Sequence, residues 1–341
     1  SSGNGGGSAT TTTGTDPENL KVAIGGQITT LDPGLSTETV NNYVLRHTTA
    51  GLFRQDEENN IVNDLCDSYT VSDDGLTYTF KLKEGVIWSD DQPLSSKDFE
   101  YAILRNLTYG AENSWAVYYP SSYLKGAEEI LADDTFDPEN DTIEGIETPD
   151  DQTLVLNLKK PCAWFPQMLT NNVWKPLRAD FATQHDSLWA LKPGYPSVGA
   201  YVLKECNENE KAIVVKNDKY YDADSVTMPQ ITFLVMSDTD ARALAFKNNE
   251  IDIALSITPT LAETYSNPGE IWNKPDVSNY FLAINSGSTG PETMQNVDVR
   301  RALALAIDKD ALVSAVGSSE YYKVLNGYIP EGLAGAEGDF R

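Results

Sequence analysis

The chain has 341 residues, of which 40% are hydrophobic, so it is long enough for two or three domains with substantial cores. Its 51 acidic and 25 basic residues give a net charge of −26, which argues against nucleic acid or anionic lipid as partners. There is no run of 18 apolar residues, so we predict no membrane span. The patterns CxxC, HExxH and the EF-hand loop are missing, so we predict no catalytic residue, metal or cofactor.

The first 15 residues are nearly all Gly, Ser, Thr, Ala and Asn. Such a segment cannot bury apolar surface, and we predict a flexible tether over residues 1–16. A tether in front of a folded body suits a lipoprotein whose lipid-carrying cysteine lies just before Ser1. A cloning linker is the alternative interpretation.

The folded body begins near Pro17 with a short apolar strand at residues 20–24, which leads to Leu31-Asp32-Pro33. Residues 40–53 then predict a helix, because apolar and small residues recur on one side of it. The residues expected on that face are Val44, Leu45, Thr48, Leu52 and Phe53.

Residues 69–105 predict a strand, a tight turn, a second strand, a turn-rich loop and a capped helix. Asp74-Gly75 suits the turn, because glycine accepts the positive φ that tight turns require. Residues 76–83 alternate between apolar and polar, which indicates a half-buried strand. Ser95 and Asp98 have the spacing of a capping box at the start of the helix.

The second half of the chain predicts a sheet with a crossover helix. Residues 154–158 form one more alternating strand, and residues 201–203 and 211–216 suggest an antiparallel pair. Residues 230–236 are a strong strand, Asp238 can cap the helix that follows, and Asn249 can end that helix in the left-handed conformation. The helix is expected to carry Ala241, Leu244, Ala245 and Phe246.

Near the C-terminal end, residues 279–285 predict a strand and residues 297–307 a helix. The helix should face inward with Val299, Ala302, Leu303 and Ala306, and a further helix is expected at residues 309–316. The three cysteines are Cys66, Cys162 and Cys206, so at least one is unpaired. We expect buried free thiols; one disulfide is possible, but the sequence does not select its pair.

Four segments together resemble the peptide-type (family 5) extracellular solute-binding proteins of ABC importers. They are residues 69–105, with TYTFKLK followed by WSD; residues 198–201; residues 217–252; and residues 283–308, with VDVRRALALAID. The family usually has a Gly-x-Gly-Pro-Tyr-like turn at the second segment, from which Ser197 and Ala200 depart. Asn249 stands where the family usually has glycine.

The resemblance implies an α/β fold of the periplasmic-binding-protein type (type II, cluster C), with mixed sheets and discontinuous lobes. Lobe I would use residues 17–46 and 161–275, and lobe II would be inserted at residues 47–160. Lobe III would begin at residue 276. Family members are much longer, so we expect a C-terminally truncated chain with an incomplete third lobe.

The resemblance also implies a non-enzymatic function: binding of extracellular oligopeptides between lobes and delivery to an ABC permease and its ATPase. The protein would be a monomer on the outer face of the cytoplasmic membrane, held by a lipid anchor, or in the periplasm. An oligosaccharide, nickel chelate or opine remains an alternative ligand. A secreted hydrolase that uses two carboxylates is an alternative from another class, and so is a surface protein that senses or adheres.

The site residues that the resemblance implies come from all three lobes. Those following the Leu31-Asp32-Pro33 segment are expected to pair with the ligand backbone, and two tyrosines of lobe II would form a wall of the cleft. The remaining three would line lobes I and III. The eight residues are Thr37, Glu38, Thr39, Tyr118, Tyr119, Ser256, Asn279 and Tyr280.

Overall fold

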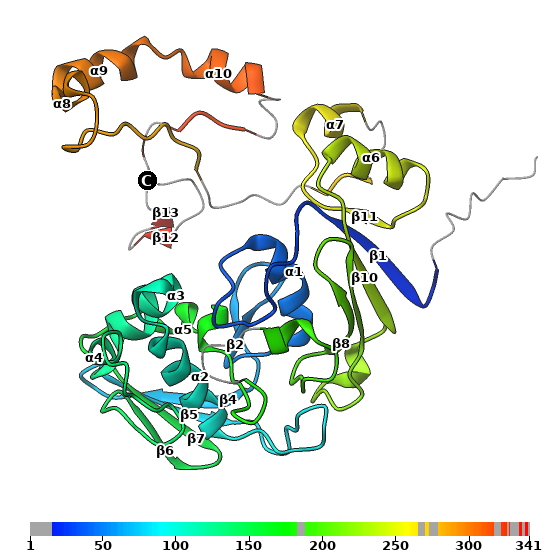
Figure 1. The fold of residues 1–341 in the computed structure, drawn as a ribbon, viewed down its shortest axis with the longest axis vertical. Coiled ribbons are helices and arrows are strands. Elements are labelled where there is room, and N and C mark those ends of the chain that lie inside the picture. The colour runs from blue at the N-terminus through cyan, green and yellow to red at the C-terminus, as the bar shows by residue number, and fades with distance from the viewer. Residues whose placement is uncertain are drawn as a thin grey trace, which may run out of the picture. The chain divides into compact units, whose positions relative to one another are not determined.

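The computed structural model describes residues 16–182, 188–264, 270–272, 279–316, 322–325, 327, 334–335 and 338–339 (Figure 1). The predicted tether therefore lies outside the described residues, except for Asp16. The chain divides into two compact units, Ser1–Leu255 and Ser256–Arg341. Each unit is described by itself. In the described part of the chain, every helix is too short or too polar to cross a bilayer.

A mixed five-stranded sheet forms one half of the first unit, with the strand order β11-β1-β10-β9-β8. Its strand β1 runs parallel to both β10 and β11, so the carboxyl ends of these three strands lie at one edge. Strands β9 and β8 are added antiparallel. The bounds are β1 (Asn19–Ile24), β8 (Tyr201–Asn207), β9 (Lys211–Lys216), β10 (Gln230–Val235) and β11 (Ile253–Ala254).

Helix α1 (Thr39–Thr48) packs against β8 and β9 with Val44, Leu45 and Thr48 buried, as predicted. The prediction that this helix reaches Phe53 was wrong. The backbone becomes extended at Thr49, and Phe53 starts β2 (Phe53–Gln55), which pairs with β3 (Ile61–Asn63). Leu52 and Phe53 are buried, but in the core of the second sheet, so apolar spacing alone extended the helix too far.

The predicted crossover from β10 to β11 is confirmed. The Asp238 side chain accepts a hydrogen bond from the Ala241 amide at 2.7 Å and so caps α6 (Thr239–Lys247). Asn249 has φ of 57°, the left-handed conformation expected after the helix. Leu244, however, is 58% exposed, and α6 buries the shorter side chains of Ala243 and Ala245.

The second sheet of the first unit is antiparallel, with the order β4-β5-β7-β6. Tyr78, Phe80 and Leu82 of β5 are buried, which confirms the predicted alternation. Helix α2 (Ser96–Thr108) packs against this sheet, and its capping box is formed, with the Asp98 carboxylate accepting from the Ser95 amide at 2.9 Å. The bounds are β4 (Cys66–Val71), β5 (Thr77–Leu82), β6 (Ile146–Asp150) and β7 (Thr153–Asn157).

Shorter helical segments complete the first unit. They are η1 (Gly110–Glu112), α3 (Ser114–Ala116), η2 (Val117–Ser121), α4 (Ala127–Ile130), α5 (Phe165–Met168), η3 (Asn172–Trp174), η4 (Leu188–Leu191) and η5 (Ala223–Ser225). All three cysteines are free thiols; Cys66 and Cys162 are buried as expected, but Cys206 is only half-buried. The first sheet takes its strands from residues 19–24 and 201–254, and the second from residues 66–157. The lobe boundaries proposed from the sequence stay a prediction.

The second unit contains helices and one short strand pair in its described residues. The bounds are α7 (Pro259–Thr264), α8 (Glu292–Gln295), α9 (Val297–Ala306), α10 (Lys309–Val316), β12 (Ala334–Gly335) and β13 (Gly338–Asp339). The strand predicted at residues 279–285 is not formed, because these residues have no pairing partner within the described ranges. Helix α9 forms as predicted, but its predicted inward face is not buried: Val299 is half-buried, and Ala302, Leu303 and Ala306 are exposed.

The segment that leads into β8 passes close to the end of α1 at Gly199. A Cβ atom on Gly199 would lie 2.6 Å from the backbone of Thr48 and Thr49. These contacts are with backbone atoms, which cannot rotate away as a flexible side chain could. Gly199 is therefore required for this close approach.

We expect Gly199→Ala to lower the free energy of unfolding by about 1–3 kcal/mol, because the added methyl forces the two segments apart. Gly51→Ala is the matched control, since its Cβ would meet no atom closer than 3.6 Å. Urea denaturation measures both variants. Equal losses in the two would show that the close approach at Gly199 has no energetic importance.

Candidate functional site

The candidate site lies beyond the carboxyl ends of the parallel strands in the first sheet. In open α/β sheets, ligands bind in the crevice at this edge. The chain leaves β1 through residues 25–38, which lead into α1, and leaves β10 through residues 236–238. The first of these segments contains the predicted residues Thr37 and Glu38.

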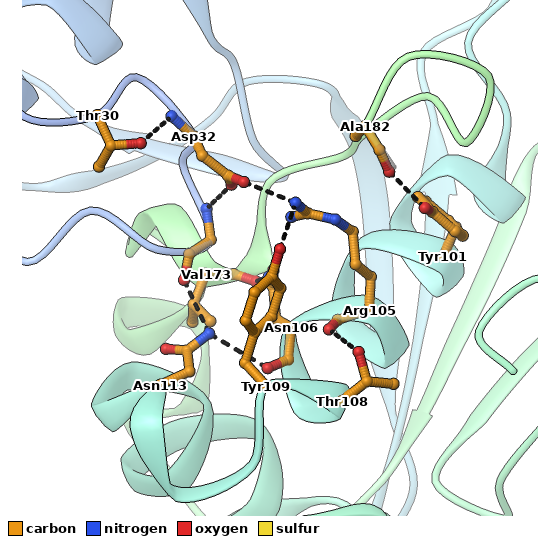
Figure 2. A network of polar contacts seen from close by, with 11 residues as sticks. Thr30, Asp32, Tyr101, Arg105, Asn106, Thr108, Tyr109, Asn113, Val173 and Ala182 are labelled. Atoms are coloured by element: carbon orange, nitrogen blue, oxygen red, sulfur yellow. Dashed lines mark hydrogen bonds and ion pairs between the residues drawn. The ribbon is translucent and has the colours of Figure 1, made fainter. Parts of the chain in front are cut away.

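A buried ion pair holds the segment after β1 to the second sheet's helix (Figure 2). Arg105 Nη2 of α2 lies 2.8 Å from Asp32 Oδ2, and both side chains are 0% exposed. The second Asp32 carboxylate oxygen accepts a hydrogen bond from the Gly34 amide at 3.0 Å. The Asp32 amide donates to Thr30 Oγ1 at the same distance. The Asp32 carboxylate therefore stabilises a tight turn at residues 32–34 and also binds Arg105.

The Arg105 guanidinium has aromatic neighbours in addition to the carboxylate. Its Nη2 also donates to the Tyr109 hydroxyl at 2.9 Å, and its carbon lies 6.0 Å from the centre of the Trp189 ring. Burial lowers the pKa of Arg105, but the Asp32 charge and its hydrogen bond more than offset this effect, so the pKa is raised overall. Arg105 therefore stays charged beneath the loop.

Two more hydrogen bonds and one close approach fix residues 34–36. Asn113 Nδ2 donates to the Gly34 carbonyl at 3.0 Å, and Trp115 Nε1 donates to the Ser36 carbonyl at 2.9 Å. A Cβ atom on Gly34 would lie 1.9 Å from the Asn106 side chain. Figure 2 shows Asn113 and Asn106 directed toward this turn of the chain. The loop is thus held from α2 and α3 before it reaches Thr37.

Three of the predicted site residues directly follow this anchored segment, and two more, Tyr118 and Tyr119, lie in η2. Thr37, Glu38 and Thr39 are exposed, and Glu38 has an extended backbone with φ of −98° and ψ of 137°. Tyr118 is 67% exposed. Tyr119 stacks on Trp115, with ring centres 5.6 Å apart. Because Trp115 also binds Ser36, it connects the loop of Thr37 to the turn that carries both tyrosines.

The other three predicted residues belong to the second unit. Ser256 has a left-handed backbone with φ of 56°. Asn279 is half-buried, and Tyr280 is 88% exposed, with its ring against Tyr322. The grouping of all eight residues in one site stays a prediction.

The sequence interpretation missed the residues that position the loop: Arg105, Asn106, Asn113 and Trp115. One signal was available, because Asn106 continues the apolar stripe of α2 that includes Phe99 and Ile103. A polar side chain at such a position needs a buried partner. Asn106 has one in the Val173 carbonyl, which accepts from its Nδ2 at 2.9 Å.

The two-sheet framework and this loop define a protein of the periplasmic-binding-protein fold. Residues 60–341 match the family described as "Bacterial extracellular solute-binding proteins, family 5 Middle", and the chain belongs to this family. It is a family of solute-binding proteins and not of enzymes. The predicted family and fold class are therefore confirmed.

Several relatives align with most of the chain. The oligopeptide-binding protein OppA of Bacillus subtilis is 28% identical over 307 residues, which cover 88% of this chain and 54% of OppA. The probable deoxycholate-binding periplasmic protein YgiS of Escherichia coli is 27% identical over 288 residues, covering 84% of this chain and 52% of YgiS. The structure of Listeria monocytogenes OppA bound to peptide has a TM-score of 0.79 at 26% identity, covering 96% of this chain and 64% of that protein. The chain spans about half the length of the curated relatives it matches.

We expect Arg105→Met to lower the free energy of unfolding by about 3–5 kcal/mol, because it leaves the Asp32 carboxylate buried without its cation. In the double variant Asp32→Asn/Arg105→Met this charge is absent, so the loss should be smaller than the sum of the two single losses. Urea denaturation of the four proteins measures the coupling.

Lys125→Met is a control for loss of a surface cation, because the Lys125–Glu144 pair is largely exposed. It should change the free energy of unfolding by less than about 1 kcal/mol. Strictly additive losses at Asp32 and Arg105 would contradict the assigned coupling.

Proposed function

We propose that this chain is the ligand-binding part of a solute-binding protein that captures oligopeptides and delivers them to an ABC permease and its ATPase. The observation that carries the proposal is the alignment of the chain with OppA proteins, including a structure with peptide bound, over 88% and 96% of its length. No bond would be made or broken. The ligand would stabilise a closed form by contacting both sides of the cleft.

The geometry of the first unit supports a peptide as the ligand. Glu38 has an extended backbone, and since its carbonyl accepts from the Asn42 amide at 3.4 Å, its amide is the group that would pair with an extended peptide, whatever the peptide's side chains are. The ion pair and the Asn113 and Trp115 contacts hold this loop in place, so little ordering free energy is lost on binding. Tyr118 and Tyr119 would form an aromatic wall of the site, and Ser256, Asn279 and Tyr280 are proposed as ligand contacts on the resemblance alone.

A non-peptide ligand is the second candidate. YgiS supports it, because its name describes probable binding of deoxycholate by a protein 27% identical to this chain. A largely exposed tyrosine such as Tyr118 could contact an apolar ligand as well as a peptide.

The proposed location is the outer face of the cytoplasmic membrane or the periplasm, with the protein as a monomer. The tether composition of residues 1–15 supports attachment through a lipid anchor. The negative net charge of −26 suits a well-solvated extracellular surface. The division into three lobes belongs to the same proposal.

Native mass spectrometry of the full-length gene product, purified from its own cells, identifies the bound ligand. We expect a series of peptide masses, because recognition of the backbone tolerates many sequences. A single mass of a bile acid, sugar, opine or metal chelate would contradict the peptide proposal.

Tyr118→Ala should weaken binding of the co-purified peptides about tenfold, which corresponds to about 1.4 kcal/mol and is typical for loss of an aromatic contact. Calorimetric titration measures the dissociation constant. Tyr69→Ala is the control, because Tyr69 is an exposed tyrosine of β4 that packs on Phe53 and Phe80. It should reduce stability and leave the dissociation constant unchanged. Unchanged binding in Tyr118→Ala would remove this residue from the site.

A further inference from the structure

Ser197 lies two residues before Gly199, close to the end of α1, and its hydroxyl makes three polar contacts. The side chain is buried, with 1% of its surface exposed. Its Oγ lies 2.6 Å from the Thr48 carbonyl and 2.7 Å from the Tyr201 carbonyl, and it accepts from the Gly199 amide at 3.1 Å. A hydroxyl has one proton, so it donates to one of the two carbonyls at a time.

The backbone of Ser197 is bound to the loop between β5 and α2. The Ser89 amide donates to the Ser197 carbonyl at 2.8 Å, and the Ser197 amide donates to Ser89 Oγ at 2.9 Å. Asp90, the next residue of this loop, pairs with Arg178, whose Nη1 lies 3.1 Å from both carboxylate oxygens. Asp91 pairs with Lys219. The loop from Trp88 to Asp91 therefore attaches the second sheet to three separate segments of the chain.

Thr48, which the Ser197 hydroxyl contacts, is the last residue of α1. The helix has ten residues and is about 15 Å long. The segment before its first residue, Thr39, is held by contacts from Arg105, Asn113 and Trp115. Contacts from the side of the second sheet thus hold α1 near both of its ends. At the carboxyl end, Ser197 binds the Thr48 carbonyl, and Lys175 Nζ donates to Thr49 Oγ1 at 2.9 Å.

We propose that Ser197 is a positioning residue of the ligand site. Through Thr48 it sets the tilt of α1 relative to the second sheet, and so the placement of residues 37–39 against Tyr118 and Tyr119. The proposal rests on the proposed function, since it takes these residues as ligand contacts. If the hydroxyl only stabilised its own turn, removing it would lower stability but leave the far end of α1 unchanged.

The Trp115 ring reports on that far end, because its Nε1 donates to the Ser36 carbonyl. The full-length protein is labelled with 5-fluorotryptophan, and the Trp115 resonance is assigned in the ¹⁹F NMR spectrum with Trp115→Phe. Ser197→Ala should shift or broaden this resonance. Ser197→Gly, which also removes the hydroxyl, should do the same, and it provides a second variant if the alanine form does not fold.

Ser96→Ala is the matched control. Ser96 is also buried, and its hydroxyl donates to the Asp150 carbonyl at 2.7 Å, but it lies at the start of α2, and this hydrogen bond leads to β6 and not to α1. It should lower stability to a similar extent and leave the Trp115 resonance in place. An unchanged Trp115 resonance in both Ser197 variants overturns the proposal.

Binding of tetra-alanine, a probe without specific side chains, is measured by calorimetry on the same proteins. We expect three- to tenfold weaker binding in Ser197→Ala and a change of less than twofold in Ser96→Ala. One outcome separates the two proposals: the Trp115 resonance moves, tetra-alanine does not bind, and the co-purified ligand is not a peptide. In that case the proposed function fails, and the placement of the loop by Ser197 stands. If peptide binds equally to all variants, Ser197 has no positioning role in the site.

Discussion

The site loop depends on one interaction, the buried ion pair between Asp32 and Arg105. Both side chains are fully buried, so their charges are tolerated only because each compensates the other. The Gly34 amide also binds the carboxylate, and the Tyr109 hydroxyl also binds the guanidinium. These requirements restrict the backbone of residues 32–34, and the contacts from Asn113 and Trp115 extend the restriction to Ser36. The exposed residues Thr37, Glu38 and Thr39 therefore follow a segment whose backbone is held in place.

The features predicted correctly from the sequence are those encoded by neighbouring residues. The capping box of Ser95 and Asp98, the alternation through Phe80 and the left-handed Asn249 each depend on a few adjacent positions. The prediction for α1 went wrong at Leu52 and Phe53, because these residues have the spacing of a helix face but belong to the core of the other sheet. Apolar periodicity indicates that a residue is buried, and it does not indicate against which element.

The candidate site was less predictable, for the same reason. Thr37 and Tyr118 were proposed because the chain resembles a family, while the contacts that connect their segments join residues far apart in the sequence. Trp115 binds the carbonyl of Ser36, 79 positions away, and Arg105 binds Asp32, 73 positions away. Every residue type has a backbone carbonyl, so the identity of residue 36 does not indicate that it binds Trp115. This contact could therefore not be predicted from the sequence. An asparagine on the apolar stripe of α2 was the one visible indication.

The pairing of β1 with β10 also affects the order in which the first unit can fold. Asn19 lies opposite Gln230, so a loop of more than 200 residues must close before this strand has its neighbour. The second sheet takes all its strands from residues 66–157 and can form as soon as that segment is available. Strand β1 is synthesised first but reaches its place only after residue 235, and until then its apolar residues have no partner strand. The edge of the sheet where the ligand is proposed to bind is thus among the last parts of the first unit to be completed.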